Sequence, residues 1–184
     1  MDAKSNDPSV PEDEDLLHAS RFRVVRRYRR LPSGTVVARE IVEHPGAVTI
    51  LPLVDDSHVC LIRNYRVAVG RALLELPAGT LEHGEDPTLC AERELVEETG
   101  YRAGRIERAC EFFMSPGILN ERMHLFVARD LVLGETELEE GEEIERAVVA
   151  WDEAMRLVRT GEVQDAKSLV GLLWHDGLLK GRSP

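Results

Sequence analysis

The sequence predicts an α/β fold with a mixed β-sheet, preceded by a small antiparallel β element. Hydrophobic residues make up 43% of the 184 residues, enough for one globular domain with a small appended piece. Segments with strand character come first, one helical segment follows, and further strands and two helices close the chain. This order lacks the regular strand–helix alternation of a doubly wound sheet, and therefore favours a mixed one.

The chain before the main domain divides into a tail and a β element. Residues 1–19 predict a disordered acidic tail, because the first 15 contain six acids and little to bury. Residues 20–45 predict the β element. Its two strand-like runs, FRVVRRYRR and TVVAREIVE, are rich in β-branched or aromatic residues and are separated by the turn Pro32-Ser33-Gly34.

Residues 46–180 are the predicted main domain, which opens with the strand-like runs AVTILPLV, HVCLIR and LLELPAG. The period then becomes helical over residues 87–99. Asp86 is an N-cap residue followed by Pro87, and Gly100 stands where a helix would end. The stripe expected to be buried consists of Leu89, Ala91, Leu95, Val96 and Thr99. Beyond this helix we expect strands at 106–114, 123–133 and 145–151, and helices at 152–159 and 167–174.

Composition excludes several classes of protein. The formal net charge of −11 argues against a general binder of nucleic acid or of an anionic membrane. The longest apolar stretch, Ala47–Val54, is much shorter than the roughly 20 residues of a membrane-spanning helix. Cys60, Cys90 and Cys110 have no paired spacing, which argues against a disulfide framework or a zinc site. We therefore expect a cytoplasmic protein without nucleic-acid or membrane partners.

The predicted helix carries an acidic cluster, Glu94, Glu97 and Glu98, in which Glu94 and Glu98 share a face. One interpretation is a solvated acidic face. Against it, like charges at i and i+4 repel each other, and the helix dipole opposes anions near the C-terminus. The other interpretation is a site for a hard divalent cation such as Mg²⁺ or Mn²⁺, because all the donors are oxygens.

The residues around this cluster follow a fixed spacing. Gly79 is followed by five residues and Glu85, then by seven residues and Arg93-Glu94-Leu95, one residue, Glu97-Glu98, one residue, and Gly100-Tyr101. This resembles the Nudix box, G-x5-E-x7-R-E-U-x-E-E-x-G-U, with the aromatic Tyr101 at its last apolar position. The resemblance covers about residues 46–175. It implies a Nudix hydrolase with an α/β/α sandwich that cleaves a nucleoside diphosphate linked to another moiety.

The resemblance also implies a cofactor, Mg²⁺, for which Mn²⁺ substitutes. Arg93 is expected to orient the glutamates and, at i and i+4, to pair with Glu97. Glu94 and Glu98 are the implied ligands, with Glu97 as a ligand or a support. The implied site as a whole comprises the backbone carbonyl of Ala78 and the carboxylates of Glu85, Glu94, Glu97 and Glu98.

Features outside the box resemble the ADP-ribose pyrophosphatase group. They are the runs LELPAG before the box, RNYR at residues 63–66, Pro116 in a Ser-Pro-Gly turn, and QDAKS at residues 164–168. Taken singly, each has a simpler interpretation: a turn at Pro116, a solvated strand end at Arg66, and a helix cap at Asp165. Their shared order and spacing favour the resemblance.

This second resemblance implies a substrate site. Arg66 would bind the pyrophosphate or the nucleotide end, because its fork matches phosphate oxygens. Glu75 would belong to the same site, and the Pro116 loop with Glu121 would border the terminal ribose.

The Glu-rich segment at 135–145 has two interpretations. Its composition is typical of a solvated, mobile loop. In ADP-ribose pyrophosphatases the loop at this point carries the carboxylate that activates water. Alignment on its Glu-Glu-Ile ending makes Glu142 the expected base, with Glu140 as the second choice.

The basic run at residues 21–30 has six arginines and no acid, and three interpretations. One face could bind RNA, or the run could be an exposed edge strand. In the related group, the N-terminal strands pack across a two-fold dimer. That interpretation implies a homodimer through these strands, with Phe22 or Tyr28 stacking on the adenine bound by the partner.

The sequence thus predicts a Mg²⁺-dependent Nudix hydrolase that cleaves ADP-ribose to AMP and ribose 5-phosphate. Another nucleoside diphosphate sugar, such as GDP-mannose, is the alternative substrate, since no feature excludes it. A non-catalytic ADP-ribose sensor with a Nudix fold is a further alternative. The intact box argues against the sensor, because a pure binder has no need of all the glutamates.

Overall fold

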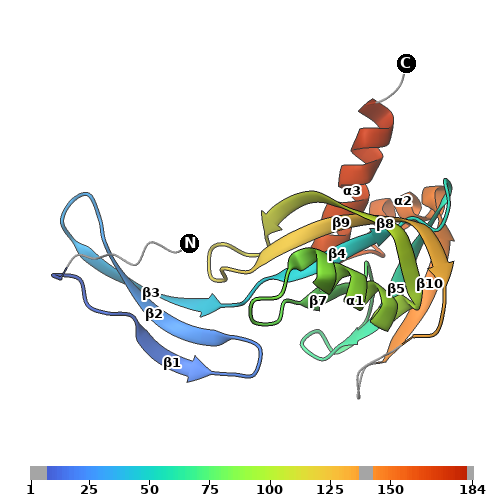
Figure 1. Cartoon of the computed structure of the whole chain (residues 1–184). Helices are drawn as coiled ribbons and strands as arrows, with labels where there is room; N and C mark the ends of the chain where they lie inside the picture. The colour runs from blue at the N-terminus through green and yellow to red at the C-terminus, as the bar shows by residue number, and fades with distance from the viewer. Residues whose placement is uncertain (1–7, 137–142, 182–184) are drawn as a thin grey trace. The chain divides into compact units, whose positions relative to one another are not determined.

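The computed structural model describes residues 8–136 and 143–181 and divides into two compact units (Figure 1). Unit 1 comprises residues 1–45 and 113–121, and unit 2 comprises residues 46–112 and 122–184. Each unit is described by itself.

Unit 1 is built on a three-stranded antiparallel sheet of order β1-β2-β3, formed by Glu14–His18, Arg23–Arg30 and Val36–Glu43. The predicted strands at 22–30 and 35–43 are therefore present. Strand β1, however, lies inside the segment predicted to be disordered, and for these five residues that prediction was wrong. Strand β1 pairs with β2 along its length, so neighbouring backbone rather than side-chain burial orders it.

The basic run lies on β2, which is the central strand of this sheet. The interpretation of β2 as an edge strand was therefore wrong. Acidic residues flank its arginines: Arg26 donates hydrogen bonds to Glu14 at 2.8 Å and Glu40 at 2.9 Å, one on each neighbouring strand. Arg27 binds Asp13 at 2.8 Å and also contacts Glu43. Much of the local positive charge is thus matched within unit 1.

Unit 2 holds two sheets, of order β7-β4-β9-β8 and β10-β5-β6. In the first sheet β4 runs parallel to β9 and antiparallel to β7, so the sheet is mixed, as predicted. The strands of unit 2 are β4 Ala47–Pro52, β5 His58–Arg66, β6 Arg71–Glu75, β7 Ala78–Thr80, β8 Tyr101–Phe113, β9 Arg122–Leu133 and β10 Ile144–Ala150, and β8 ends at the boundary with unit 1. The helices are α1 Pro87–Thr99, α2 Trp151–Thr160 and α3 Ala166–Gly181.

Strand β4 is buried along its whole length because helices cover both faces of its sheet (Figure 1). Val48 and Ile50 pack with residues of α1 in one core cluster. Leu51 and Leu53 pack with residues of α2 and α3 in the other. This is the arrangement of an α/β/α sandwich, and it explains why Ala47–Val54 reads as one continuous apolar run.

Helix α1 has the ends that the sequence predicts. The Asp86 side chain accepts a hydrogen bond from Thr88 N–H at 2.8 Å, Pro87 begins the helix, and Gly100 ends it with φ 72°. The prediction was wrong for one residue of the buried stripe. Leu89 is 61% exposed, and Cys90 is buried in its place. Helix α1 meets its sheet along Cys90, Ala91 and Leu95, which turns Leu89 outward.

Helix α3 approaches the strands closely at Gly171. A Cβ at this position would lie 2.5 Å from Leu76 Cδ1, whereas a Cβ at Gly177 of the same helix would meet nothing within 4 Å. We expect Gly177→Ala to stabilise the protein by about 0.5–1 kcal/mol through helix propensity. Gly171→Ala should destabilise it by about 1–2 kcal/mol, because the added methyl overpacks a closed core. Chemical denaturation of the two variants measures the difference, and equal effects would contradict this account of Gly171.

Among the helices in the described part of the chain, none is both long and apolar enough to cross a membrane.

Candidate active site

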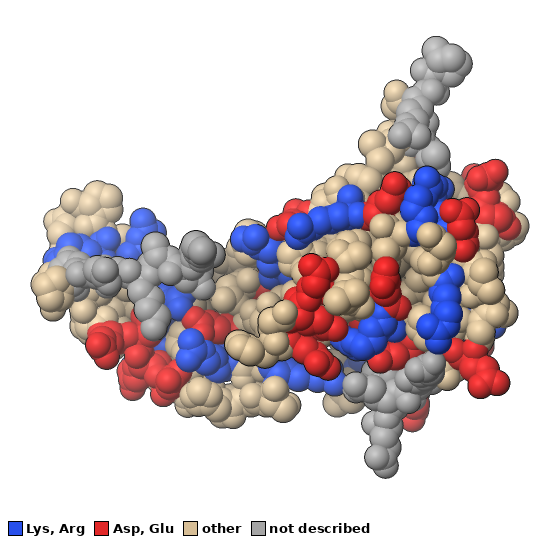
Figure 2. Space-filling model, in the orientation of Figure 1, with Lys and Arg blue, Asp and Glu red and all other residues tan. Residues whose placement is uncertain are grey.

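Three carboxylates of α1 and the segment before it gather around one arginine. The Arg93 guanidinium donates to Glu94 at 2.7 Å, to Glu97 at 2.8 Å, and to Glu85 at 3.1 and 3.3 Å. The predicted pair of Arg93 with Glu97 is therefore present. Partial burial works against ionisation of Glu85, but the hydrogen bonds from Arg93, Glu82 N–H and Cys90 together with the charge of Arg93 outweigh it and lower the pKa of that carboxyl. On the face shown in Figure 2, acidic and basic side chains accordingly lie side by side over the region of α1.

Glu98, one turn beyond Glu94 on the same helix, is only 5% exposed. Its Oε2 accepts a hydrogen bond from Ala78 N–H at 2.8 Å. Burial raises the pKa of the Glu98 carboxyl to about 8, against the lowering effect of that hydrogen bond, and the charge of Glu94 raises it further. The site therefore holds a carboxylate whose negative charge lacks solvation and has a second carboxylate near it.

The backbone between β6 and α1 completes this arrangement. A Cβ on Gly79 would lie between 1.7 and 2.3 Å from the three carboxyl atoms of Glu94, so only a glycine lets that carboxylate rest against the chain. Ala78 N–H donates to the Glu98 carboxyl, and the Glu94 carboxyl packs against Gly79. Two carboxylates at i and i+4 thus converge on one short stretch of backbone.

The residues just before this stretch, Glu75 and Leu76, contact a group of ionised and polar side chains, here called the Glu75 cluster. The Glu75 carboxylate is 1% exposed and binds both Arg66, at 2.6 and 2.9 Å, and Lys167, at 2.5 Å. Ser168 accepts a hydrogen bond from Leu76 N–H at 2.6 Å. The cluster comprises Arg66, Glu75, Asp165, Lys167 and Ser168.

The NUDIX domain family matches residues 43–171. This chain belongs to the NUDIX family. It is 44% identical over 140 residues to the ADP-ribose pyrophosphatase of Bacillus subtilis, an alignment that covers 75% of this chain and 76% of that protein. It is 34% identical over 166 residues to a GDP-mannose pyrophosphatase of Klebsiella pneumoniae, covering 82% of each. The crystal structure of an ADP compounds hydrolase is similar to it with a TM-score of 0.82 and 27% identity, covering 95% of each chain.

These similarities confirm the predicted Nudix fold and identify the chain as a pyrophosphohydrolase, a Nudix hydrolase. The Nudix box is then the segment from Gly79 through Tyr101, in which the contacts of Arg93, Glu94 and Glu98 lie. Nudix hydrolases generally depend on divalent metal ions.

The carboxylates of the Nudix box do not converge on a single point. Across residues 8–136 and 143–181, no three His, Cys, Asp or Glu side chains come together as metal ligands. Arg93 binds Glu85, Glu94 and Glu97, while Glu98 faces Ala78. The donor set nevertheless fits a hard cation, because Glu94 and Glu98 offer carboxylate oxygens, and both side chains lie against the same backbone segment.

The remaining predicted site residues are divided among different parts of the chain. Arg66 and Glu75 lie in unit 2 together with the Nudix box. Glu140 and Glu142 lie outside the described residues. Phe22, Tyr28, Pro116 and Glu121 belong to unit 1.

The positions of these unit 1 residues within the unit are well defined. Phe22 is partly exposed just before β2, Tyr28 lies on β2, and Pro116 is exposed in the loop after β8. Glu121 lies 3.6 Å from His44. Their roles stay predictions.

Sequence reasoning missed Lys167 and Ser168 as parts of the site. The QDAKS run indicates only a resemblance and a helix cap at Asp165. Asp165 does cap α3, accepting from Ser168 N–H at 3.0 Å. The sequence pattern that indicates such a cluster is a lysine followed by a serine in the first turn of a largely apolar helix. A lysine at that position is expected to be buried, and a buried cation needs an acidic partner.

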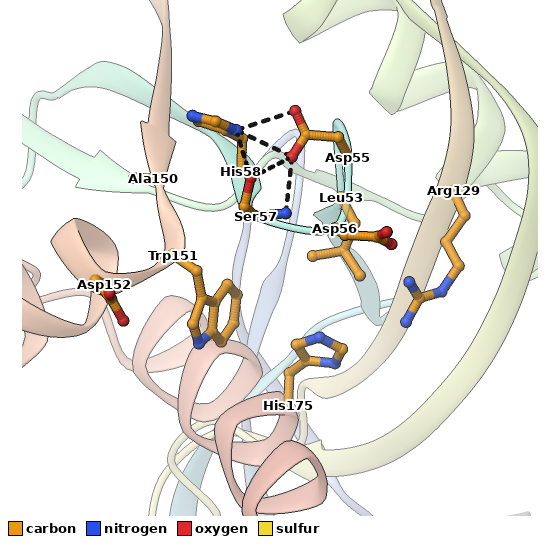
Figure 3. A pocket seen from close by; sticks show the side chains of 10 residues that line it. All are labelled: Leu53, Asp55, Asp56, Ser57, His58, Arg129, Ala150, Trp151, Asp152 and His175. Atoms are coloured by element: carbon orange, nitrogen blue, oxygen red, sulfur yellow. Dashed lines mark hydrogen bonds and ion pairs between the residues drawn. The ribbon is translucent and has the colours of Figure 1, made fainter.

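A cavity of about 380 Å³ lies elsewhere in unit 2 and contains none of the predicted site residues (Figure 3). It lies between the β4–β5 turn, the start of α2 and α3. Its Asp55 is used by the turn itself: hydrogen bonds from Ser57 N–H and from His58 lower the pKa of that carboxyl to about 2. Trp151 meets His175 edge to face at 4.9 Å, so these rings pack against each other.

Proposed function

We propose that this protein is a divalent-metal-dependent hydrolase that cleaves the pyrophosphate of ADP-ribose, giving AMP and ribose 5-phosphate. The observation that carries the substrate is the 44% identity to an ADP-ribose pyrophosphatase over three quarters of the chain. The contacts of the Nudix box support the chemistry, since they gather carboxylates where a polyanionic substrate requires a cation.

The proposed cofactor is Mg²⁺, with Mn²⁺ as a substitute. Glu94, Glu98 and the carbonyl of Ala78 would hold it, with Glu97 and Glu85 in support. When bound, a divalent cation neutralises charge on the pyrophosphate and lowers the pKa of the attacking water. We expect chelation by EDTA to abolish turnover and added Mg²⁺ to restore it.

The protein's own groups have separate tasks in this proposal. Arg93 holds Glu85, Glu94 and Glu97 in place, as its hydrogen bonds support. Arg66 binds the pyrophosphate through its fork. A carboxylate of the loop before β10 takes the proton from the attacking water.

We expect Glu142→Gln to lower kcat about a hundredfold, the usual scale for removal of a general base. Glu140→Gln is the matched control and should change kcat by less than about threefold. Supporting this placement, Ile144, two residues beyond Glu142, pairs with Asn64 on β5, two residues before Arg66. Steady-state kinetics of both variants checks the assignment, and the opposite order of effects would show that the alignment of the loop is wrong.

The proposal for unit 1 is that its strands form a homodimer. Phe22 or Tyr28 would stack on the adenine bound by the partner subunit, and Pro116 with Glu121 would border the terminal ribose. Partial exposure of Phe22 supports the first of these roles. Gel filtration with light scattering tests the dimer, and a monomer at micromolar concentration would contradict it. The free thiols of Cys60, Cys90 and Cys110 fit a reducing compartment such as the cytoplasm.

GDP-mannose is the second candidate substrate, favoured by the 34% identity to a GDP-mannose pyrophosphatase. A turnover panel of ADP-ribose, GDP-mannose, NADH and diadenosine polyphosphates with Mg²⁺, followed by product identification, decides between them. The fastest turnover should be of ADP-ribose, with AMP as a product. Binding of ADP-ribose without any hydrolysis would instead support a sensor.

A further inference from the structure

Lys167 is a buried cation whose task the Nudix box does not explain. It is only 5% exposed, and its Nζ lies 2.5 Å from Glu75 Oε2 and 2.9 Å from Asp165 Oδ2. A lysine is seldom buried unless it is paired. Here one ammonium group donates hydrogen bonds to two carboxylates, Glu75 and Asp165, which are distant from each other in the sequence.

Glu75, which Lys167 binds, also binds Arg66 and fixes its orientation. Both oxygens of its carboxylate bind the guanidinium, Oε1 at Nε and Oε2 at Nη2, which is the two-pronged geometry that fixes an arginine plane. Arg66 is 38% exposed in its side chain, whereas Glu75 and Lys167 are buried. In the described part of the chain, Arg66 Nη1 makes no hydrogen bond. The arginine is therefore the outer end of a series of contacts that starts at Lys167.

The balance of charge in the Glu75 cluster depends on Lys167. Arg66 and Lys167 contribute two positive charges, and Glu75 and Asp165 contribute two negative ones. Without Lys167 the cluster would hold two carboxylates and a single cation, Arg66, and would therefore be negative. A negative cluster beside Arg66 would oppose the binding of a pyrophosphate.

We propose that Lys167 is a positioning residue for pyrophosphate binding, which neutralises the buried Glu75 carboxylate and its partly buried neighbour Asp165, and thereby holds Arg66 with its plane fixed and its positive charge available. The proposal rests on the proposed function, since it assumes a pyrophosphate substrate. In this proposal Lys167 does not touch the substrate, and it acts on Arg66 through Glu75, the carboxylate that binds both cations. The same helix turn holds the neighbouring backbone, because Ser168 Oγ accepts from Leu76 N–H.

The first test is kinetic and uses the full-length protein with Mg²⁺ and ADP-ribose. Lys167→Met should raise KM about tenfold, the scale of one lost interaction with a charged group, and change kcat less than threefold. Lys167→Arg keeps the charge and should restore KM to within threefold of the wild type. The matched control is Arg156→Gln, which removes a surface cation paired with Glu153 and should leave KM unchanged.

A double variant separates positioning from a general loss of structure. If Lys167 acts through Glu75, the KM of Glu75→Gln with Lys167→Met should equal that of Glu75→Gln alone. The proposal would be overturned if the rise in KM of the double variant were the product of the rises in the two single variants. A KM for Lys167→Met within twofold of the wild type would also overturn it. Should Lys167→Met fail to fold, Lys167→Gln keeps a donor for Glu75 without the charge and is expected to show the same rise in KM.

The second test does not depend on turnover. In ¹H–¹⁵N spectra of the wild type, the Nε–H signal of Arg66, assigned by its loss in Arg66→Lys, should be protected from exchange with water. In Lys167→Met that signal should shift and exchange faster, and in Arg156→Gln it should not change. An unchanged signal in Lys167→Met would overturn the positioning role. If the wild type hydrolyses no nucleoside diphosphate compound, the proposed function fails, and this spectrum still decides whether Lys167 orients Arg66.

Discussion

Replacing Glu98 with Gln is expected to lower kcat about a thousandfold and to leave the protein folded. Glu98 is the buried carboxylate that faces Ala78, and a ligand of a catalytic cation contributes several kcal/mol of transition-state stabilisation, which corresponds to three or more powers of ten in rate. The fold should tolerate the change, because a neutral amide of the same shape does not carry a poorly solvated charge.

The measurement is turnover of ADP-ribose over a range of Mg²⁺ concentrations, together with thermal unfolding in EDTA. Glu92→Gln is the matched control, since Glu92 is an exposed residue of the same helix. It should retain activity within about twofold. A Glu98→Gln variant as active as the wild type would remove Glu98 from the proposed metal site.

The second large effect is expected from a single methyl group. Gly79→Ala would place a Cβ within 1.7–2.3 Å of the Glu94 carboxyl atoms, so that carboxylate has to move. The displaced group is the end of a flexible side chain, and the loss of stability should therefore be small. Catalysis should fall about 10²–10³-fold, because a shift of about 1 Å in a positioned group is enough for a loss of that order.

Kinetics of Gly79→Ala, Glu94→Gln and the double variant test this mechanism. If Gly79 matters through Glu94, the double variant should be no slower than Glu94→Gln alone. Gly177→Ala, at a glycine with open space around it, serves as the control for the substitution itself. Full activity in Gly79→Ala would show that the position of Glu94 in this structure is not the productive one.

Helix α1 and the box were predictable because their determinants are local. Asp86, Pro87 and Gly100 act on the residues next to them, so the ends of the helix can be read from neighbouring positions. The pairing of Arg93 with Glu97 follows from helical spacing alone. The mixed sheet followed from the order of strand and helix patterns. The spacing from Gly79 to Tyr101 is enough to identify the family, because it needs no contact between distant residues.

Features that depend on partners distant in sequence were missed or predicted wrongly. Strand β1 has no side-chain burial that a pattern could show, and it exists because β2 lies beside it. The exposure of Leu89 depends on how α1 turns against its sheet, which neighbouring residues do not determine. The roles predicted for Pro116 and Glu142 stay predictions, the first in unit 1 and the second outside the described residues.

Only the tertiary structure decided what surrounds the box. It brought Glu75 and Lys167 together across 92 residues, and it laid Glu94 on the backbone of Gly79. The physical reason is that buried charges need partners, and folding alone determines which oppositely charged group reaches them.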